Sequence, residues 1–320
     1  MNSGRADHDR EPGRSAAAEN RPPTVARSGV INLNKPSGIT SRQAVDAVKR
    51  LVRPAKTGHA GTLDPLACGV LVVCVGAATR FIEYVQRMPK RYLGTFLLGR
   101  GSPTEDVEGE ISYLSDPPQP ALDEIRRAAD RLTGEIMQRP PAFSALKIAG
   151  RRAYDLARAG RAVELPPRPV TVHRIDVLHY DYPELTLDIA CGSGTYIRSL
   201  GRDLAESLGT SAVMSALVRT EIGAFLLEDA CRPDELNHEN LRQRLLPQER
   251  AVESLPTIEL SEEEAKRIAN GLTIVRDSAA LAKLPAGDEL AAFGPHGKLM
   301  GIVAKRPDGG LRAVRNLPPP

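Results

Sequence analysis

The spacing of apolar residues changes repeatedly from residue 29 onward, which divides the chain into short strands and helices. Alternation and short apolar runs predict strands at residues 30–33, 70–75, 91–98, 171–180, 185–191 and 214–227. Apolar residues three or four positions apart predict helices near residues 40–52, 79–86, 121–132, 151–159, 194–208 and 235–245. Strands and helices mix without regular βαβ alternation, so the pattern indicates the α+β class.

Polar and glycine residues mark the ends of several predicted helices. Thr40 and Gln43 have the spacing of a capping box at a helix start. Gly134 and Gly209 follow helical patterns and suit the left-handed position that ends a helix. The boundaries of these helices are therefore predicted from residue chemistry as well as from periodicity.

Composition divides the chain into three parts. Residues 1–28 are rich in Arg, Ala, Pro and acidic residues with almost no large apolar ones, which predicts a disordered extension. A boundary near residues 249–256 separates the main domain, residues 29–253, from a small module, residues 254–320. In this module Ser261 and Glu264 cap a helix that ends at Gly271, and Gly-Pro-rich turns at residues 294–297 and 307–310 predict β-hairpins.

Positive charge is concentrated in one segment. The formal net charge is only +3, but residues 139–174 hold eight basic residues against two acidic ones, the basic ones being Arg139, Lys147, Arg151, Arg152, Arg158, Arg161, Arg168 and Arg174. Such an excess is typical of a surface that follows nucleic-acid phosphates. A solvated helix face is the alternative that the residues alone leave open.

Several classes of protein are excluded by what the sequence lacks. The four cysteines form no C-x-x-C pair or ligand cluster, which favours reduced thiols in a cytoplasmic protein and gives no metal site. The longest apolar run, near residues 69–78, is too short to span a membrane. Neither a phosphate-binding glycine loop nor an H-E-x-x-H motif occurs, so we expect no nucleotide cofactor and no catalytic zinc.

The segment from His59 to Gly69 is the strongest candidate for chemistry. Two glycines and Pro65 constrain a turn that carries Asp64, although an ordinary turn with Asp64 capping a backbone amide fits too. Arg198 lies one position off the apolar stripe of its helix, where it suits either a functional or a structural ion pair with a carboxylate. Taken alone, Tyr92 suits a core aromatic, and His59 suits a hydrogen-bonded turn residue.

Five segments occur together in the order of a known family. They are Lys35-Pro36-Ser37-Gly38, His59-Ala60-Gly61-Thr62-Leu63-Asp64-Pro65-Leu66-Ala67, Lys90-Arg91-Tyr92, Phe143-Ser144-Ala145-Leu146-Lys147 and Gly194-Thr195-Tyr196-Ile197-Arg198. On these segments the chain resembles the bacterial tRNA pseudouridine-55 synthases of the TruB family. The resemblance covers about residues 29–250 well and the tail more weakly.

The resemblance implies a fold and roles for individual residues. It implies a mixed, largely antiparallel sheet flanked by helices, with a small RNA-binding module of the PUA type at the C-terminus. Asp64 matches the catalytic nucleophile, Arg198 its ion-pair partner, and Tyr92 the tyrosine that lies against the target base and is implicated in removing the C5 proton. His59 matches a residue that stabilises the gap left by the flipped base. Further matches are Lys35 and Leu217 near the active site, Asp106 in contact with RNA, and Lys147, Arg151 and Arg152 in a basic insertion at about residues 139–170 that grips the T-arm.

The resemblance also implies the reaction and its partners. Isomerisation of uridine 55 breaks the N1–C1′ bond and rejoins the base through C5, and the base must first leave its stack. A monomer acting on tRNA without a cofactor or an obligatory protein partner is expected. The alternatives are a guide-RNA-dependent synthase of the same superfamily, a tRNA-binding or folding protein without chemistry and, more remotely, a hydrolase using Asp64. Phe143 and Ser102 depart from the family's usual Tyr and Thr.

Overall fold

The computed structural model describes residue 1 and residues 28–144, 147–148, 151–152, 165–276, 281 and 283–317. Within these residues the largest sheet has nine strands, in the order β1-β3-β12-β4-β11-β10-β7, with β2 on β3 and β13 on β12. The strands are Gly29–Lys35 (β1), Thr57–His59 (β2), Cys68–Val75 (β3), Lys90–Leu98 (β4), Gly134–Gln138 (β7), Arg168–Asp181 (β10), Glu184–Cys191 (β11), Ala212–Ile222 (β12) and Phe225–Leu226 (β13). The predicted extension at residues 1–28 lies almost entirely outside the described residues.

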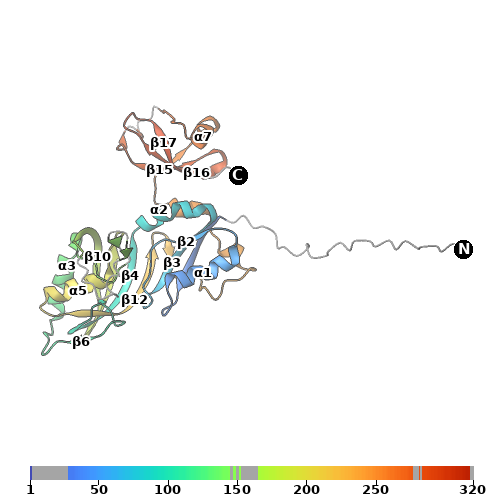
Figure 1. Cartoon of the computed structure of the whole chain (residues 1–320). Helices are drawn as coiled ribbons and strands as arrows, with labels where there is room; N and C mark the ends of the chain where they lie inside the picture. Colours follow the sequence, from blue (N-terminus) through green and yellow to red (C-terminus); the bar gives the residue numbers. More distant parts are fainter. Residues whose placement is uncertain are drawn as a thin grey trace.

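Strand β12 joins the two halves of this sheet. It pairs in parallel with β3 and antiparallel with β4, whereas the other pairs of the large sheet are antiparallel. Helices α3 (Leu122–Arg131) and α5 (Ile197–Ser207) pack side by side near β10 and β12 (Figure 1), and α1 (Ser41–Val52) packs against β2 and β3. The predicted α+β class with a mixed, largely antiparallel sheet is therefore confirmed.

The predicted capping signals of α1 and α5 are confirmed, whereas that of Gly134 is not. Thr40 caps α1, its hydroxyl accepts from the Gln43 amide, and the Gln43 side chain accepts from the Thr40 amide. Helix α5 ends before Gly209, whose φ is +73°. Helix α3 ends at Arg131, while Gly134, with φ +101°, opens strand β7, which the sequence pattern did not predict.

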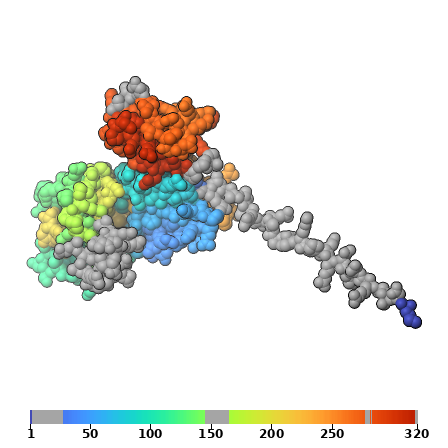
Figure 2. Space-filling view, turned by 45° about the horizontal axis from the view of Figure 1, so that its top comes forward, coloured from blue at the N-terminus to red at the C-terminus, as the bar shows by residue number. Residues whose placement is uncertain are grey.

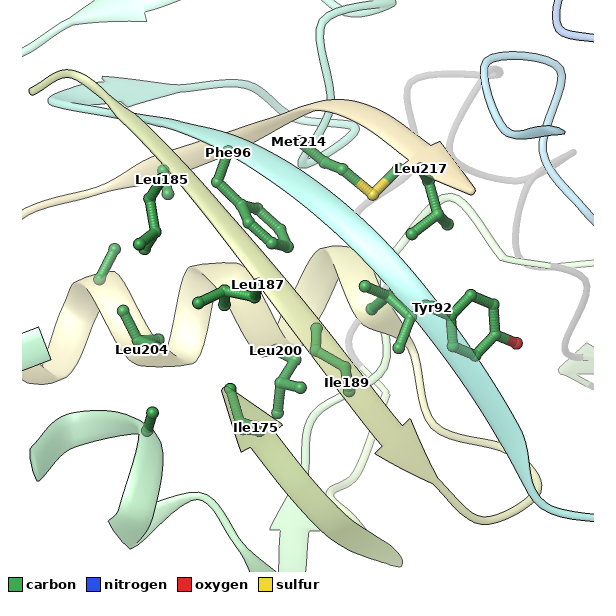
Figure 3. Close-up of a cluster of buried hydrophobic side chains, with 14 of the residues drawn as sticks. Tyr92, Phe96, Ile175, Leu185, Leu187, Ile189, Leu200, Leu204, Met214 and Leu217 are labelled. Carbon is green, nitrogen blue, oxygen red and sulfur yellow. The ribbon is translucent and has the colours of Figure 1, made fainter. Parts of the chain in front are cut away.

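A buried apolar cluster lies between α5 and strands β4, β11 and β12 (Figure 3). Phe96 of β4 packs so closely on α5 that a Cβ at Gly201 would lie 2.1 Å from the Phe96 ring, so only glycine fits there. Tyr92 stands at one end of the same cluster, with its hydroxyl directed away from the other labelled side chains in Figure 3. The cluster therefore reaches the place where the candidate site lies.

Two predicted helices differ most from the structure. Arg151–Arg152 forms strand β9, paired with β8 (Lys147–Ile148), so a helix beginning at Arg151 is wrong, and residues 153–159 lie outside the described residues. Only Leu241–Arg244 of the predicted helix at residues 235–245 is helical (α6). The Asn237 carboxamide accepts from the amides of Glu239 and Asn240, and such local bonds compete with a helix.

Smaller elements complete the main domain. They are the 3₁₀ segments Gly76–Phe81 and Gln248–Val252, helix α2 (Ile82–Arg87), and the strand pair β5 (Arg100–Gly101) with β6 (Ser112–Tyr113). The predicted helix near residues 79–86 is thus split between a 3₁₀ turn and α2. No helix among the described residues is both long and apolar enough to cross a membrane.

The C-terminal residues form a β-rich module seated over α2 (Figure 2). Its sheet runs β14-β15-β16-β17, with bounds Thr257–Glu259, Glu289–Phe293, Leu299–Lys305 and Leu311–Asn316, beside helix α7 (Glu262–Ala269) and the 3₁₀ turn Pro295–Gly297. Apolar side chains of the module, including Leu299 and Ile302, share a buried cluster with Tyr84 of α2. The Tyr84 hydroxyl and the Arg87 guanidinium both donate to the Glu289 carboxylate, at 3.2 and 2.5 Å. The junction is therefore partly apolar and partly ionic.

Candidate active site

Asp64 stands on a turn between β2 and β3 that is held from behind by the segment after β1. The Ser41 hydroxyl donates to the Leu63 carbonyl at 2.9 Å and accepts from the Leu63 amide at 2.8 Å. On the other side of Asp64, the Gly38 amide donates to the Pro65 carbonyl at 2.8 Å. Bonds on both sides fix the backbone of the turn and leave the Asp64 side chain free to face the cavity, 39% exposed. The sequence pattern gave no sign of the role of Ser41.

Lys35 supports the same turn and does not line the cavity. Its ammonium is fully buried and donates to the carbonyls of Pro36, Ile39 and Pro65, at 3.0, 2.6 and 3.4 Å. Burial lowers the pKa of Lys35 to about 8, against the opposing field of nearby anionic groups that include Asp64. Lys35 is thus near the site, as predicted, but it contacts backbone oxygens of the turn.

Arg198 joins three separate segments at the site. Its Nε lies 3.0 Å from Asp64 Oδ2, and the side chain is 6% exposed. Its two terminal nitrogens donate to the carbonyls of Thr104, at 2.5 Å, and Phe143, at 3.0 Å. The planar guanidinium is therefore fixed by neutral acceptors on one side and holds the carboxylate on the other. Because Phe143 acts here through its carbonyl, having Phe rather than Tyr at this position does not alter the contact.

Asp106 lies behind Arg198. Its carboxylate is 5% exposed, 3.8 Å from Arg198 Nε, and accepts from the Thr104 hydroxyl at 2.5 Å and the Glu108 amide at 3.1 Å. It is absent from the cavity wall. Contact between Asp106 and RNA remains a prediction.

A cavity of about 420 Å³ opens in front of Asp64. This volume is in the range of pockets that hold small organic groups. The predicted residues Asp64, Tyr92, Arg198 and Leu217 share its wall, whereas His59 does not. The full lining is Gly61, Thr62, Leu63, Asp64, Gln86, Lys90, Tyr92, Phe143, Ser144, Arg168, Gly192, Ser193, Gly194, Thr195, Tyr196, Ile197, Arg198, Leu217 and Arg219.

Tyr92 faces this cavity beside a buried arginine that sequence reasoning missed. Burial raises the pKa of the Tyr92 phenol, and the charge of Arg219 opposes that rise. The Arg219 guanidinium lies 6.0 Å from the centre of the Tyr92 ring and donates to the carbonyls of Val70, at 2.7 Å, and Gly61, at 3.0 Å. Arg219 follows Leu217 by two residues on β12, so both side chains lie on the same face of the sheet. This spacing from a predicted site residue is the signal by which Arg219 could have been found in the sequence.

Lys90 is a third buried cation on the cavity wall, after Arg198 and Arg219. Its ammonium donates to the carbonyls of Gln86 and Met88, the latter at 2.6 Å. Burial and, to a smaller extent, the charge of Arg219 lower the pKa of Lys90 to about 8. With Arg198 and Arg219, it makes the cavity a site for anionic or strongly polar groups.

The remaining predicted residues lie away from the cavity or outside the description. His59 is half-buried on β2, and burial lowers its pKa. The strands that contain Lys147, Arg151 and Arg152 are described, but their side chains are not. Among the described residues no group of three or more His, Cys, Asp or Glu is placed to hold a metal ion.

Comparison with known proteins places the chain among named relatives. Residues 49–197 match the model of the TruB family pseudouridylate synthase N-terminal domain. A Corynebacterium aurimucosum protein named tRNA pseudouridine synthase B is 44% identical over 77% of this chain and 84% of its own length. A Clostridium tetani protein of the same name is 36% identical over 88% and 97%.

The fold has relatives among solved structures. One, described as the crystal structure of the archaeal box H/ACA sRNP Nop10–Cbf5 complex, aligns with a TM-score of 0.65 and 27% identity, covering 87% of this chain and 79% of that chain. A Cbf5–Nop10–Gar1 complex aligns with a TM-score of 0.66 and 28% identity over 87% and 78%. Together with the sequence relatives, these matches mean that this chain belongs to the TruB family of pseudouridine synthases.

Proposed function

We propose that this protein isomerises uridine 55 in the T-loop of tRNA to pseudouridine. The relatives at 36–44% identity carry the name tRNA pseudouridine synthase B. The observation that carries the proposal is a half-exposed Asp64 carboxylate, fixed by Arg198, on the wall of a cavity that also contains Tyr92. These are the groups that moving a base from N1 to C5 requires.

The proposed reaction is an isomerisation, so the nucleotide has the same atoms before and after it. The target uridine flips out of its stack into the cavity. Asp64 attacks or stabilises the sugar as the N1–C1′ bond breaks, and the freed base rotates. A C5–C1′ bond then forms and releases Asp64 from the sugar. The Tyr92 hydroxyl is protonated at the outset because burial raises its pKa, so it passes its own proton to N1 as its oxygen accepts the proton that C5 loses. Arg198 keeps the Asp64 carboxylate directed at the sugar through both bond changes.

Recognition of the RNA is assigned to two parts of the chain. The basic segment at about residues 139–170 is proposed to follow the phosphates of the T-arm. The module from residue 254 onward is proposed to be PUA-like and to add contacts outside that arm. A cytoplasmic monomer that uses neither guide RNA nor a protein partner completes the proposal.

One assay tests this function against its alternatives. Purified protein is incubated with an unmodified tRNA transcript, and pseudouridine is mapped at every position. Conversion at position 55 of the transcript without an added guide RNA supports the proposal. Conversion only with an added guide RNA would support the guide-dependent alternative, and binding without conversion would support a tRNA-folding protein.

Neutralising the basic segment is expected to weaken tRNA binding and reduce its salt dependence. Replacing Arg151, Arg152 and Arg158 with glutamine together removes three positive charges. For each phosphate that is no longer neutralised, the slope of log K against log salt falls by about 0.7–0.9. Filter binding across a salt series measures this, with the exposed Arg42, Arg126 and Arg232 replaced together as the control. If both triple variants had the same slope of log K against log salt, the basic segment would be a solvated surface that does not contact the phosphates.

Removing the C-terminal module is expected to weaken binding while preserving turnover. A chain ending at Leu255 retains every residue of the cavity wall, so single-turnover rates at saturating enzyme are expected to stay near wild type. Affinity is expected to fall by about tenfold, corresponding to about 1.4 kcal/mol of binding free energy. The melting temperature is also expected to fall, because Leu299 and Ile302 no longer cover the cluster around Tyr84. A soluble truncated protein that binds tRNA without chemistry would mean that the module helps to build the site.

A further inference from the structure

Helix α5 holds two loops against the active site through side chains on neighbouring turns. Arg198 donates to the Thr104 and Phe143 carbonyls. One residue later the Ser199 hydroxyl donates to Glu105 Oε2 at 2.7 Å. One turn further along the helix, Arg202 pairs with the same carboxylate through Nη1 and donates to the Arg139 carbonyl through Nη2, at 2.8 Å. Glu105 thus fixes the 102–108 loop to α5 through two residues of that helix, Ser199 and Arg202.

The backbone of Glu105 is equally constrained. Its φ of +62° lies in the left-handed region, which a residue with a Cβ rarely adopts. Its amide donates to the Ser102 carbonyl at 3.0 Å, and its own carbonyl accepts from the Met214 amide of β12 at 3.0 Å. The side chain is 12% exposed, and burial raises its pKa while Ser199 and Arg202 oppose the rise. A strained backbone and a buried carboxylate coincide at the residue next to Thr104.

Glu105 is placed to act through Thr104 rather than on the substrate. Neither Glu105 nor Arg202 lines the cavity in front of Asp64. Both line a separate cavity, of about 650 Å³, beside Pro103 and Arg139. The connection to the reaction therefore runs from Glu105 to the neighbouring Thr104 carbonyl, from there to Arg198, and from Arg198 to Asp64.

We propose that Glu105 is a positioning residue, whose ion pair with Arg202 and hydrogen bond from Ser199 fix the Thr104 carbonyl so that Arg198 aligns Asp64 with the sugar. The proposal rests on the proposed function. A displacement of about 1 Å at a reacting group can lower a rate by about 100-fold, so a small shift of this loop has a measurable effect on catalysis. We expect tRNA binding to depend little on this contact, because neither Glu105 nor Arg202 lines the cavity in front of Asp64.

The experiment compares Glu105→Gly, Glu105→Gln and Asp203→Asn under single-turnover conditions with excess enzyme. Glycine accepts the left-handed backbone and removes the carboxylate, and its expected rate is about 10- to 100-fold below wild type. Glutamine keeps the shape of the side chain and the hydrogen bond from Ser199. The rate of Glu105→Gln is therefore expected to lie between that of the wild type and that of Glu105→Gly. Asp203 also pairs with Arg202, at 2.7 Å, but does not contact the loop, so its variant is expected within about twofold of wild type.

Two further measurements separate positioning from a general loss of structure. The Kd for tRNA is expected to stay within about threefold of wild type for Glu105→Gly, since only the chemical step is affected. In an Arg198→Lys background, Glu105→Gly is expected to slow the reaction by less than about threefold, because its effect runs through Arg198.

Unchanged rates for Glu105→Gly, equal losses for Asp203→Asn, or fully additive effects with Arg198→Lys would each overturn the positioning role. Activity of the wild type on the same transcript tests the proposed function separately. A wild type that makes pseudouridine beside an unimpaired Glu105→Gly variant would therefore reject this role alone.

Discussion

Replacing Asp64 with asparagine is expected to abolish pseudouridine formation. The amide has the shape of the carboxylate but cannot attack the sugar or stabilise positive charge on it, and loss of a nucleophile lowers rates by more than about 1,000-fold. The turn itself is held by backbone bonds to Ser41 and Gly38, so the variant is expected to fold and to bind tRNA. Single-turnover conversion of a tRNA transcript and filter binding measure the two properties.

The control for this substitution is Asp46→Asn. Asp46 is a half-exposed aspartate on α1 that pairs with Arg42 at 3.2 Å and lies outside the cavity wall, so its loss is expected to leave activity unchanged. Activity of Asp64→Asn above about a thousandth of the wild-type activity would contradict the assignment of Asp64 as the nucleophile.

Replacing Tyr92 with phenylalanine is expected to slow the chemical step by about 10²- to 10⁴-fold, the usual contribution of a proton-transfer group. The ring stays packed on the apolar cluster and beside Arg219, so folding and tRNA affinity are expected to be preserved. Only the hydroxyl, which points away from the other labelled side chains of the cluster in Figure 3, is lost. Single-turnover rates beside a tRNA titration distinguish a loss in chemistry from a loss in binding.

Tyr84→Phe is the matched control for Tyr92→Phe. Tyr84 is also buried, but its hydroxyl donates to Glu289 at the junction with the C-terminal module. Loss of that hydrogen bond is expected to lower the free energy of unfolding by about 1 kcal/mol and to leave turnover unchanged. If Tyr92→Phe retained wild-type turnover, Tyr92 would be a packing residue and another group would have to accept the C5 proton.

The site combines a fixed carboxylate with several buried cations. Arg198, Arg219 and Lys90 each donate to two backbone carbonyls, and none of these bonds requires a bound ligand. The cavity is therefore preorganised for negative charge that develops during the reaction, because its charged groups need not reorient when the base enters.

Elements that depend on local chemistry were predictable from the sequence. The capping box of Thr40 and Gln43, the glycine that ends α5 and the alternating strands each follow from interactions or conformations within a few residues. The constrained turn of Asp64 was readable for the same reason. The order of the five motifs indicated the family and thereby predicted functional roles for Tyr92 and Arg198. Taken alone, these two residues were also compatible with structural roles.

Which side chains meet at the site depends on the folded chain as a whole. Arg219 reaches Val70 and Gly61 only because β12 pairs in parallel with β3, and a Cβ at Gly69 would lie 2.2 Å from the Arg219 carbonyl where the two strands meet. Asp106 is buried behind Arg198, and Lys35 supports the turn from the side away from the cavity. Periodicity shows which face of an element is buried, but it carries no information about which distant segment covers that face. Interactions between residues far apart in the chain therefore completed the site.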